Sequence, residues 1–219
     1  MDILLNHFNN NIISLGSNCH VKLLFKNYID TPTLFFDWIG TSLWFINHFF
    51  FTDTNFFYPQ DFKLIKIFNK YHNESVYTNT KYYIRFQHDI NNIEDIIITK
   101  IKYEKRKNRF IQTLNDSNYI LFVRIEELFI QNRNFPPNIK KYYHKNELQY
   151  LQEFNNIIND KFTHLKFKIL LFSFTINTSI IDNILIIKLP IITNYHSFQP
   201  TLKKYIKKNK HIIKQFIQN

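Results

Sequence analysis

Four short apolar runs divide the chain, and between them apolar residues recur every three or four positions. The runs show little alternation between apolar and polar positions, which is typical of strands covered on both faces, as in a parallel sheet. We therefore expect strands at Ile12 to Leu15, Tyr119 to Ile125, Phe167 to Phe174 and Ile184 to Leu189.

Helical periodicity fills most of the sequence between these runs. The predicted helices span Cys19 to Tyr28, Thr41 to Phe51, Ile93 to Leu114, Lys145 to Asn159 and Pro200 to Ile217. The alternation of strands and helices predicts an α/β fold. We expect a single layered domain over residues 1–219, with a mostly parallel central sheet flanked by helices.

Two segments fit this alternation less well. Tyr82 to Phe86 is a further short strand candidate. The stretch 51–81 is rich in Asn, Thr and aromatic residues, and its periodicity is weak. We expect it to form an irregular excursion over the sheet, as a lid or as a wall of a substrate site.

The biased composition makes the rare residue types more informative than the common ones. The 219-residue chain has no alanine, two glycines and one cysteine, and its lysines greatly outnumber its arginines. Residues with GC-rich codons are scarce, which indicates an AT-rich genome. Because lysine has AT-rich codons, part of the net charge of +11 reflects this bias rather than function. The few Gly, Arg and Cys residues are therefore more informative than usual. Lysines gather in two helix-like segments, 100–107 and 203–210, which form solvated helix faces or bind a polyanion.

Several classes of protein do not fit the sequence. No apolar run reaches the roughly 18–20 residues of a membrane helix, and the N-terminus lacks the basic region of a secretory signal. A lone cysteine forms neither an internal disulfide nor a Cys-based zinc site, which favours a cytoplasmic location. Gly-rich phosphate loops and the common metalloprotease and serine hydrolase motifs are absent, so we expect no cofactor and no metal.

The stretch SLGSNC places a rare glycine and the single cysteine at the end of the first predicted strand. Gly16 provides a tight turn, Ser17 and Asn18 follow it, and Cys19 begins the next helix. Open α/β sheets bind ligands at the carboxyl ends of their strands, and a helix N-terminus favours a thiolate. Cys19 is thus a candidate nucleophile. The alternative is a small, buried apolar residue.

A carboxylate and a histidine are candidates to act with Cys19. Asp37, in FFDWIG, lies among aromatic residues where a charge needs a partner. It either orients a histidine or binds substrate, or else it caps the helix that starts near Thr41 or locks the loop before that helix by a hydrogen bond. His88, in RFQHD, follows a strand candidate and is the candidate base for Cys19, with Asp37 or Asp89 orienting its ring.

Two arginines are candidate ligands of an anion. Arg124 ends the strand YILFVR at the same sheet edge as Gly16, and Arg106 lies in the helical segment YEKRKNRF. A guanidinium at either place binds a substrate carboxylate or phosphate, or else pairs with an internal acid, such as Glu104 in the case of Arg106.

Taken in order, IISLGSNCHVKLLFKN, FFDWIG, FQHD, YEKRKNRF and ILFVRIEE resemble the family described as "putative papain-like cysteine peptidase", a domain of unknown function in bacteria and giant DNA viruses. The likeness runs from Ile12 to Glu127. It implies Cys19 as nucleophile, His88 as base, Asp37 or Asp89 as orienting acid, and a peptide or other acyl substrate. The substrate would then be bound by Gly16, Ser17, Asn18, Asp89, Arg124 and Arg106.

The resemblance has two further implications. A viral source would place the protein in the host cytoplasm or in the virion. A papain-like domain is a helix packed on an antiparallel barrel, whereas the apolar runs predict parallel strands between helices. The same residues would serve a cysteine hydrolase or acyltransferase built on an α/β sheet.

Three functions from different classes stay open at this point. The first is a cysteine hydrolase, in which N–H groups after Gly16 stabilise the oxyanion. The second is a transferase-like domain that binds a nucleotide sugar or phosphorylated compound, with a structural Cys19 and with Arg124 and Arg106 as clamps. The third is nucleic-acid binding by the basic helices. It is the least favoured because the sequence lacks the aromatic-basic strand motif of nucleic-acid-binding sheets.

Overall fold

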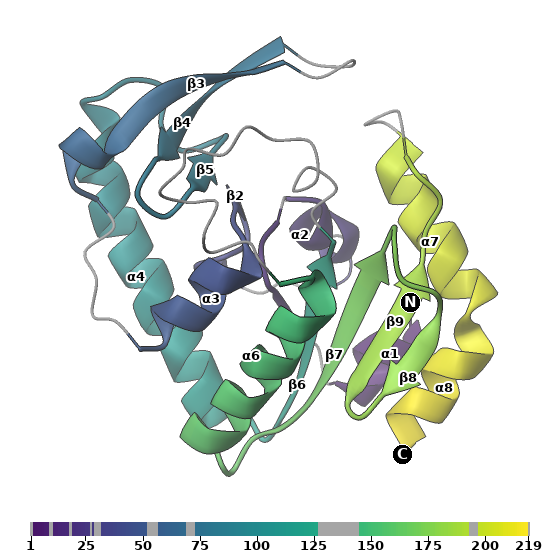
Figure 1. Cartoon of the computed structure of the whole chain (residues 1–219). Helices are drawn as coiled ribbons and strands as arrows, with labels where there is room; N and C mark the ends of the chain where they lie inside the picture. Colours follow the sequence, from purple (N-terminus) through teal and green to yellow (C-terminus); the bar gives the residue numbers. More distant parts are fainter. Residues whose placement is uncertain are drawn as a thin grey trace.

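A computed structural model describes residues 2–8, 11–17, 19–26, 28, 32–51, 57–68, 73–126, 145–192 and 197–218. Its centre is a five-stranded sheet in the order β1-β6-β7-β9-β8 (Figure 1). Within the described strands of this sheet, only β8 and β9 pair antiparallel, so the predicted mostly parallel sheet is confirmed. The strands are β1 (Ile12–Ser14), β6 (Tyr119–Ile125), β7 (Lys166–Ser173), β8 (Ser179–Ile181) and β9 (Ile184–Lys188).

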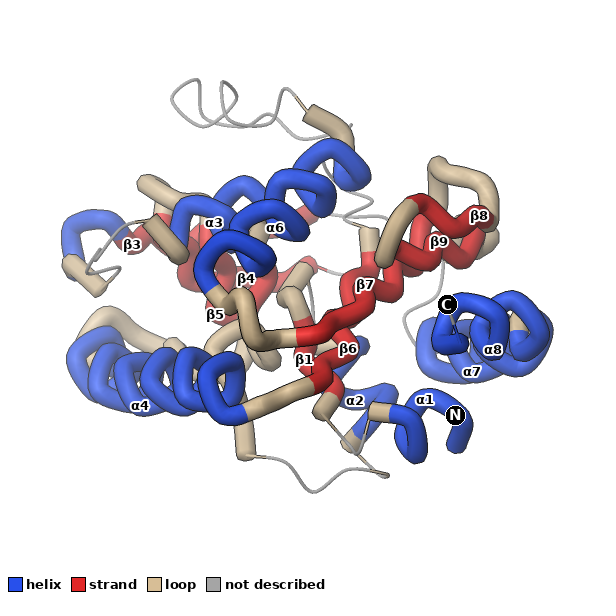
Figure 2. The backbone as a smooth tube through the Cα atoms, turned by 90° about the horizontal axis from the view of Figure 1, so that it is seen from below, coloured by secondary structure: helices blue, strands red, loops and turns tan. Residues whose placement is uncertain are grey.

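Helices cover both faces of this sheet, as Figure 2 shows. One face packs against α3 (Leu43–Phe49), α4 (Asp95–Asp116) and α6 (Glu147–Lys161). The other packs against α1 (Asp2–His7), α2 (His20–Phe25), α7 (Phe198–Lys208) and α8 (Lys210–Gln218).

Strand β6 shows why the central strands lack alternation in the sequence. Ile120 and Phe122 are buried on the face of α3, α4 and α6, whereas Leu121 and Val123 are buried on the opposite face. A strand that is covered on both sides needs apolar residues at every position. The unbroken runs in the sequence are a direct consequence of these two apolar clusters.

A second, antiparallel sheet in the order β2-β5-β4-β3 was not expected. It corrects the prediction of irregular structure for the described part of 51–81, because residues 62–68 and 73–79 pair along their whole length. A role of this segment as a lid or substrate wall stays a prediction. Thr78 and Asn79 are buried although they are polar, so the hydrophobic pattern of this sheet is weak. Its elements are β2 (Ile39–Gly40), the 3-10 helix η1 (Pro59–Asp61), β3 (Phe62–Phe68), β4 (Asn73–Asn79) and β5 (Ile84–Phe86).

The helix ends follow local capping chemistry. The Ser42 side chain accepts a hydrogen bond from the Phe45 N–H and starts α3 two residues later than predicted. Asn146 and Gln149 form a reciprocal capping box at the start of α6. The C-terminal helix predicted as continuous is divided at Asn209 into α7 and α8. Within the described ranges, no helix has both the length and the apolar character that crossing a membrane requires.

Candidate active site

The SLGSNC loop leaves the carboxyl end of β1 and folds against β2. Gly16 has φ +66° and Ser17 has φ +71°, so two successive residues are left-handed. A Cβ atom on Gly16 would lie 2.7 Å from Cγ2 of Thr41. Glycine is therefore required here both by the backbone conformation and by the close approach of the segment after β2. Asn18 lies outside the described residues.

Two arginines bind the carbonyl oxygens of this loop. Arg124, which is fully buried, donates to the oxygens of Leu15 (2.6 Å) and Thr41 (2.8 Å) and pairs with Glu147 at the start of α6 (3.1 Å). Arg85 donates to the oxygen of Ser17 (3.1 Å). The loop before Cys19 is thus held from β6 and from β5.

The second glycine of the chain serves one of these contacts. A Cβ atom on Gly40 would lie 2.7 Å from the guanidinium nitrogens of Arg85. Gly40 and Arg85 are also opposite each other in the β2–β5 pair. Glycine in FFDWIG therefore leaves the space through which the Arg85 side chain reaches the SLGSNC loop.

Cys19 is at the N-cap position of α2, is 4% exposed and forms no disulfide. The next residue, His20, stacks on the Phe198 ring of α7 with centroids 4.2 Å apart. The Gln199 amide donates to the His20 backbone oxygen (2.7 Å). Burial lowers the pKa of His20 to about 4. His20 is therefore neutral near pH 7 and ties the start of α2 to α7.

Asp37 locks its own loop and contacts α2. Its Oδ2 accepts a hydrogen bond from the Leu34 N–H (2.8 Å) and pairs with Lys22 (3.2 Å). Burial raises the pKa of the Asp37 carboxyl, and the Lys22 charge and the Leu34 N–H oppose that rise. Of the roles that the sequence left open for Asp37, these contacts favour the locking of the loop.

His88 is exposed and lies against Trp38, the residue that follows Asp37. The two rings meet edge to face, with centroids 5.6 Å apart and an interplanar angle of 86°. Sequence reasoning missed Trp38. Trp38 could have been chosen from the sequence because the chain has only two tryptophans and Trp38 lies inside the FFDWIG motif.

Asp89 binds α4. It accepts hydrogen bonds from the Tyr103 hydroxyl (2.6 Å) and Arg106 (3.0 Å), and it pairs with Lys102. Burial alone would raise the pKa of Asp89, but the hydrogen bonds from Lys102 and Tyr103 and the charge of Arg106 hold it below its ordinary value. Asp89 and Arg106, both expected to bind substrate, are therefore bonded to each other.

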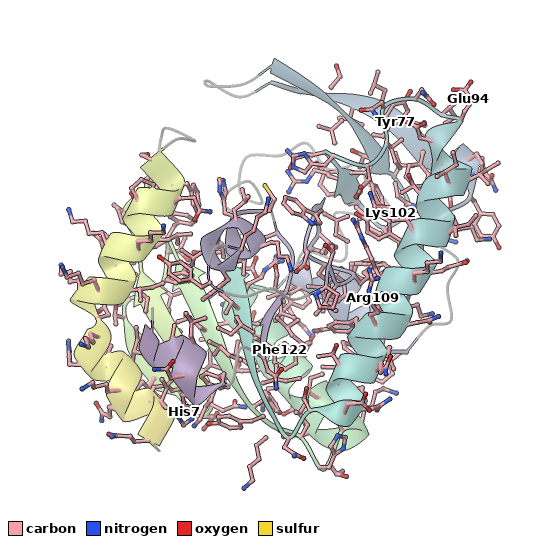
Figure 3. All side chains as sticks on the ribbon, turned by 180° about the vertical axis from the view of Figure 1, so that it is seen from behind. His7, Tyr77, Glu94, Lys102, Arg109 and Phe122 are labelled. Atoms are coloured by element: carbon pink, nitrogen blue, oxygen red, sulfur yellow. The ribbon has the colours of Figure 1, made fainter. Side chains whose placement is uncertain are left out.

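Arg109 extends this anchoring by α4. It donates to the Thr33 oxygen (2.8 Å) in the loop before FFDWIG. In Figure 3, Lys102 and Arg109 lie along the side of α4 that faces the rest of the molecule. The segment YEKRKNRF thus holds the loops of both His88 and Asp37.

These contacts bring together all five segments on which the resemblance was based. A family model described as "Putative papain-like cysteine peptidase (DUF1796)" matches residues 10–177, a range that contains all five. The chain belongs to this family. No curated protein and no solved structure matched the chain at a significant level.

The fold of this family member differs from what the family name implies. Its central sheet is mostly parallel and lies between helices, whereas the name implies a helix on an antiparallel barrel. The α/β architecture expected from the apolar runs is the one observed. Helices α7 and α8 follow the matched residues and lie outside the family model.

Glu126 was also missed as a site residue, although it lies in ILFVRIEE. It follows β6 and accepts hydrogen bonds from the Ser173 hydroxyl (2.7 Å) and from the N–H groups of Phe174 (2.5 Å) and Thr175 (2.9 Å). Its carboxylate therefore fixes the turn at the carboxyl end of β7. An acid directly after a buried strand was the only sign of this role in the sequence.

The charged groups that were expected to bind substrate pair with other charged groups of the protein. The arginines expected to clamp an anion, Arg124 and Arg106, are bonded to Glu147 and Asp89. This arrangement does not favour the transferase-like alternative. Among the described residues, no three His, Cys, Asp or Glu side chains are grouped so that they could hold a metal ion.

Proposed function

We propose that the protein is a cysteine-dependent hydrolase in which Cys19 attacks a peptide, isopeptide or other acyl carbonyl and His88 takes the thiol proton. Membership of a family described as cysteine peptidase-like supports this chemistry. The Arg85–Ser17 hydrogen bond is the observation that supports joint action of Cys19 and His88. Ser17 precedes Cys19 by two residues and Arg85 precedes His88 by three, so this bond joins the two loops.

In the proposed reaction the proton balance is complete. The Cys19 thiol gives its proton to His88, and the thiolate forms a bond to the carbonyl carbon. His88 then protonates the leaving amine or alcohol as the thioester forms. Water, deprotonated by His88, hydrolyses the thioester and restores the thiol. N–H groups that follow Gly16, including those of Ser17 and Asn18, are the proposed oxyanion donors.

The remaining residues would position this pair. Asp37 holds α2 through Lys22, and Asp89 holds the His88 loop on α4. The group packed on the His88 ring is Trp38 rather than a carboxylate. We therefore infer that Trp38 orients the imidazole, and that Asp37, Asp89, Arg106 and Arg124 act by fixing the loops.

Trapping of the acyl-enzyme tests the proposal. The protein would be incubated with a panel of fluorogenic peptide and acyl esters, and intact mass would be measured after rapid quenching. We expect a thioester adduct at Cys19 that hydroxylamine removes, no turnover in Cys19→Ala, and turnover reduced about 10²–10⁴-fold in His88→Ala. His211→Ala, at an exposed histidine on α8, is the matched control. Turnover that survives Cys19→Ala would contradict the proposal.

A further inference from the structure

The C-terminal helices carry many positive charges and no negative side chains. No acid occurs among residues 183–219, although the chain has 17 acids in 219 residues. The same stretch has six exposed lysines within α7 and α8, and in the described part of the chain none of the six forms an ion pair. They are Lys203, Lys204, Lys207, Lys208, Lys210 and Lys214.

The lysine cluster on α4 is different. Lys100 faces Glu104 at 3.9 Å, and Lys102 pairs with Asp89. The charges of α4 are thus partly neutralised within the helix and its neighbours. Those of α7 and α8 are not, which leaves a local field that attracts anions.

The apolar faces of α7 and α8 are used within the protein. Leu202, Ile206, Ile213 and Phe216 are buried against the sheet, and the exposed side chains on the two helices are Lys, His and Gln together with Pro200. A helix that lies in a membrane interface needs a free apolar face to insert. These helices instead present charged side chains on a rigid support, and the two helices follow each other along one flank of the molecule (Figure 1).

From these observations we propose that α7 and α8 form a binding surface for the phosphate backbone of a nucleic acid. From Lys203 to Lys214 the helices extend about 16 Å at 1.5 Å per residue. A duplex of that length carries roughly nine phosphates. Exposed lysines and no arginine occur on these helices, and ammonium groups of this kind bind phosphate oxygens, so we expect binding that is independent of sequence. This inference does not depend on the proposed hydrolase activity.

Fluorescence anisotropy with a labelled 20-base-pair duplex DNA tests the surface across a series of salt concentrations. Six phosphate contacts predict a slope of about −5 for the logarithm of the association constant against the logarithm of salt concentration. Substituting Lys204, Lys207, Lys210 and Lys214 by Gln should weaken binding at least 50-fold at low salt and reduce the slope to about −2.

The matched control substitutes Lys63, Lys81, Lys100 and Lys105 by Gln, which changes the net charge equally and should alter affinity less than threefold. All eight positions are exposed or nearly so, and circular dichroism would confirm that both variants fold. Equal weakening in the two variants would show that net charge alone acts, and would overturn the proposal. So would binding to vesicles rich in phosphatidylserine without binding to DNA.

Discussion

Replacement of Arg124 by methionine should be among the most destabilising single changes in this protein. Arg124 is fully buried and Glu147 is 6% exposed, so the substitution removes the guanidinium that pairs with a buried carboxylate. It also frees the oxygens of Leu15 and Thr41. Removal of one member of a buried ion pair costs about 3–5 kcal/mol. For a chain of this size that corresponds to a fall in melting temperature of about 9–15 °C.

Urea denaturation followed by tryptophan fluorescence would give the free energy of unfolding. The second variant, Arg124→Met with Glu147→Gln, also removes the buried negative charge of Glu147 and should recover about 2 kcal/mol of the loss. Glu147→Gln alone is the matched single variant that completes the cycle. A loss below about 1 kcal/mol in Arg124→Met would refute the account of this residue as the buried tie between β1, β2 and α6.

Two further predictions concern the same region. Gly16→Ala should destabilise the protein by about 2–3 kcal/mol in urea denaturation, because alanine is strained at φ +66° and its Cβ meets Thr41. An unchanged free energy of unfolding in Gly16→Ala would contradict this geometry. Gly40→Ala should lower the free energy of unfolding by about 1–2 kcal/mol, because its Cβ displaces Arg85. The free energy of unfolding should also decrease as the pH falls, because the pKa of His20 is about 4 in the folded state and about 6.5 in the unfolded chain. Because the unfolded chain binds this proton first, the contribution is complete above pH 6.5 and is lost as pH falls towards 4. Between pH 7 and pH 5 wild type should lose about 2 kcal/mol more than His20→Phe, and parallel losses in the two proteins would refute the assignment.

The central sheet could be predicted because burial on both faces leaves unbroken apolar runs in the sequence. β6 was predicted with its observed bounds, and β1, β7 and β9 within about one residue. The hairpin of β3 and β4 was not predicted, since buried polar residues such as Thr78 mask its alternation. The break at Asn209 was missed because apolar spacing continues through it.

The motif residues of the site could be chosen from rarity and position, but their partners could not. Arg85 reaches Ser17 across 68 positions of sequence, and Arg124 reaches Glu147 across a segment with no strong pattern of its own. Such pairs depend on the fold that brings them together. Substrate binding by Gly16, Ser17 and Asn18 stays a prediction, whereas the contacts of Asp89, Arg106 and Arg124 favour a role in fixing the loops. The cytoplasmic location and the single domain over residues 1–219 also stay predictions.

The most direct test of the Cys19–His88 pair is the rate of alkylation of the single cysteine by iodoacetamide from pH 5 to pH 9. Burial of Cys19 slows the reagent at every pH, so the shape of the profile rather than its height reports the thiolate. A thiolate–imidazolium pair predicts a rate that persists to about pH 6 in wild type and in His211→Ala, and that is lost below pH 8 in His88→Ala. A profile that follows an ordinary thiol near pH 8.5 in all three proteins would contradict the account and leave Cys19 as a structural residue.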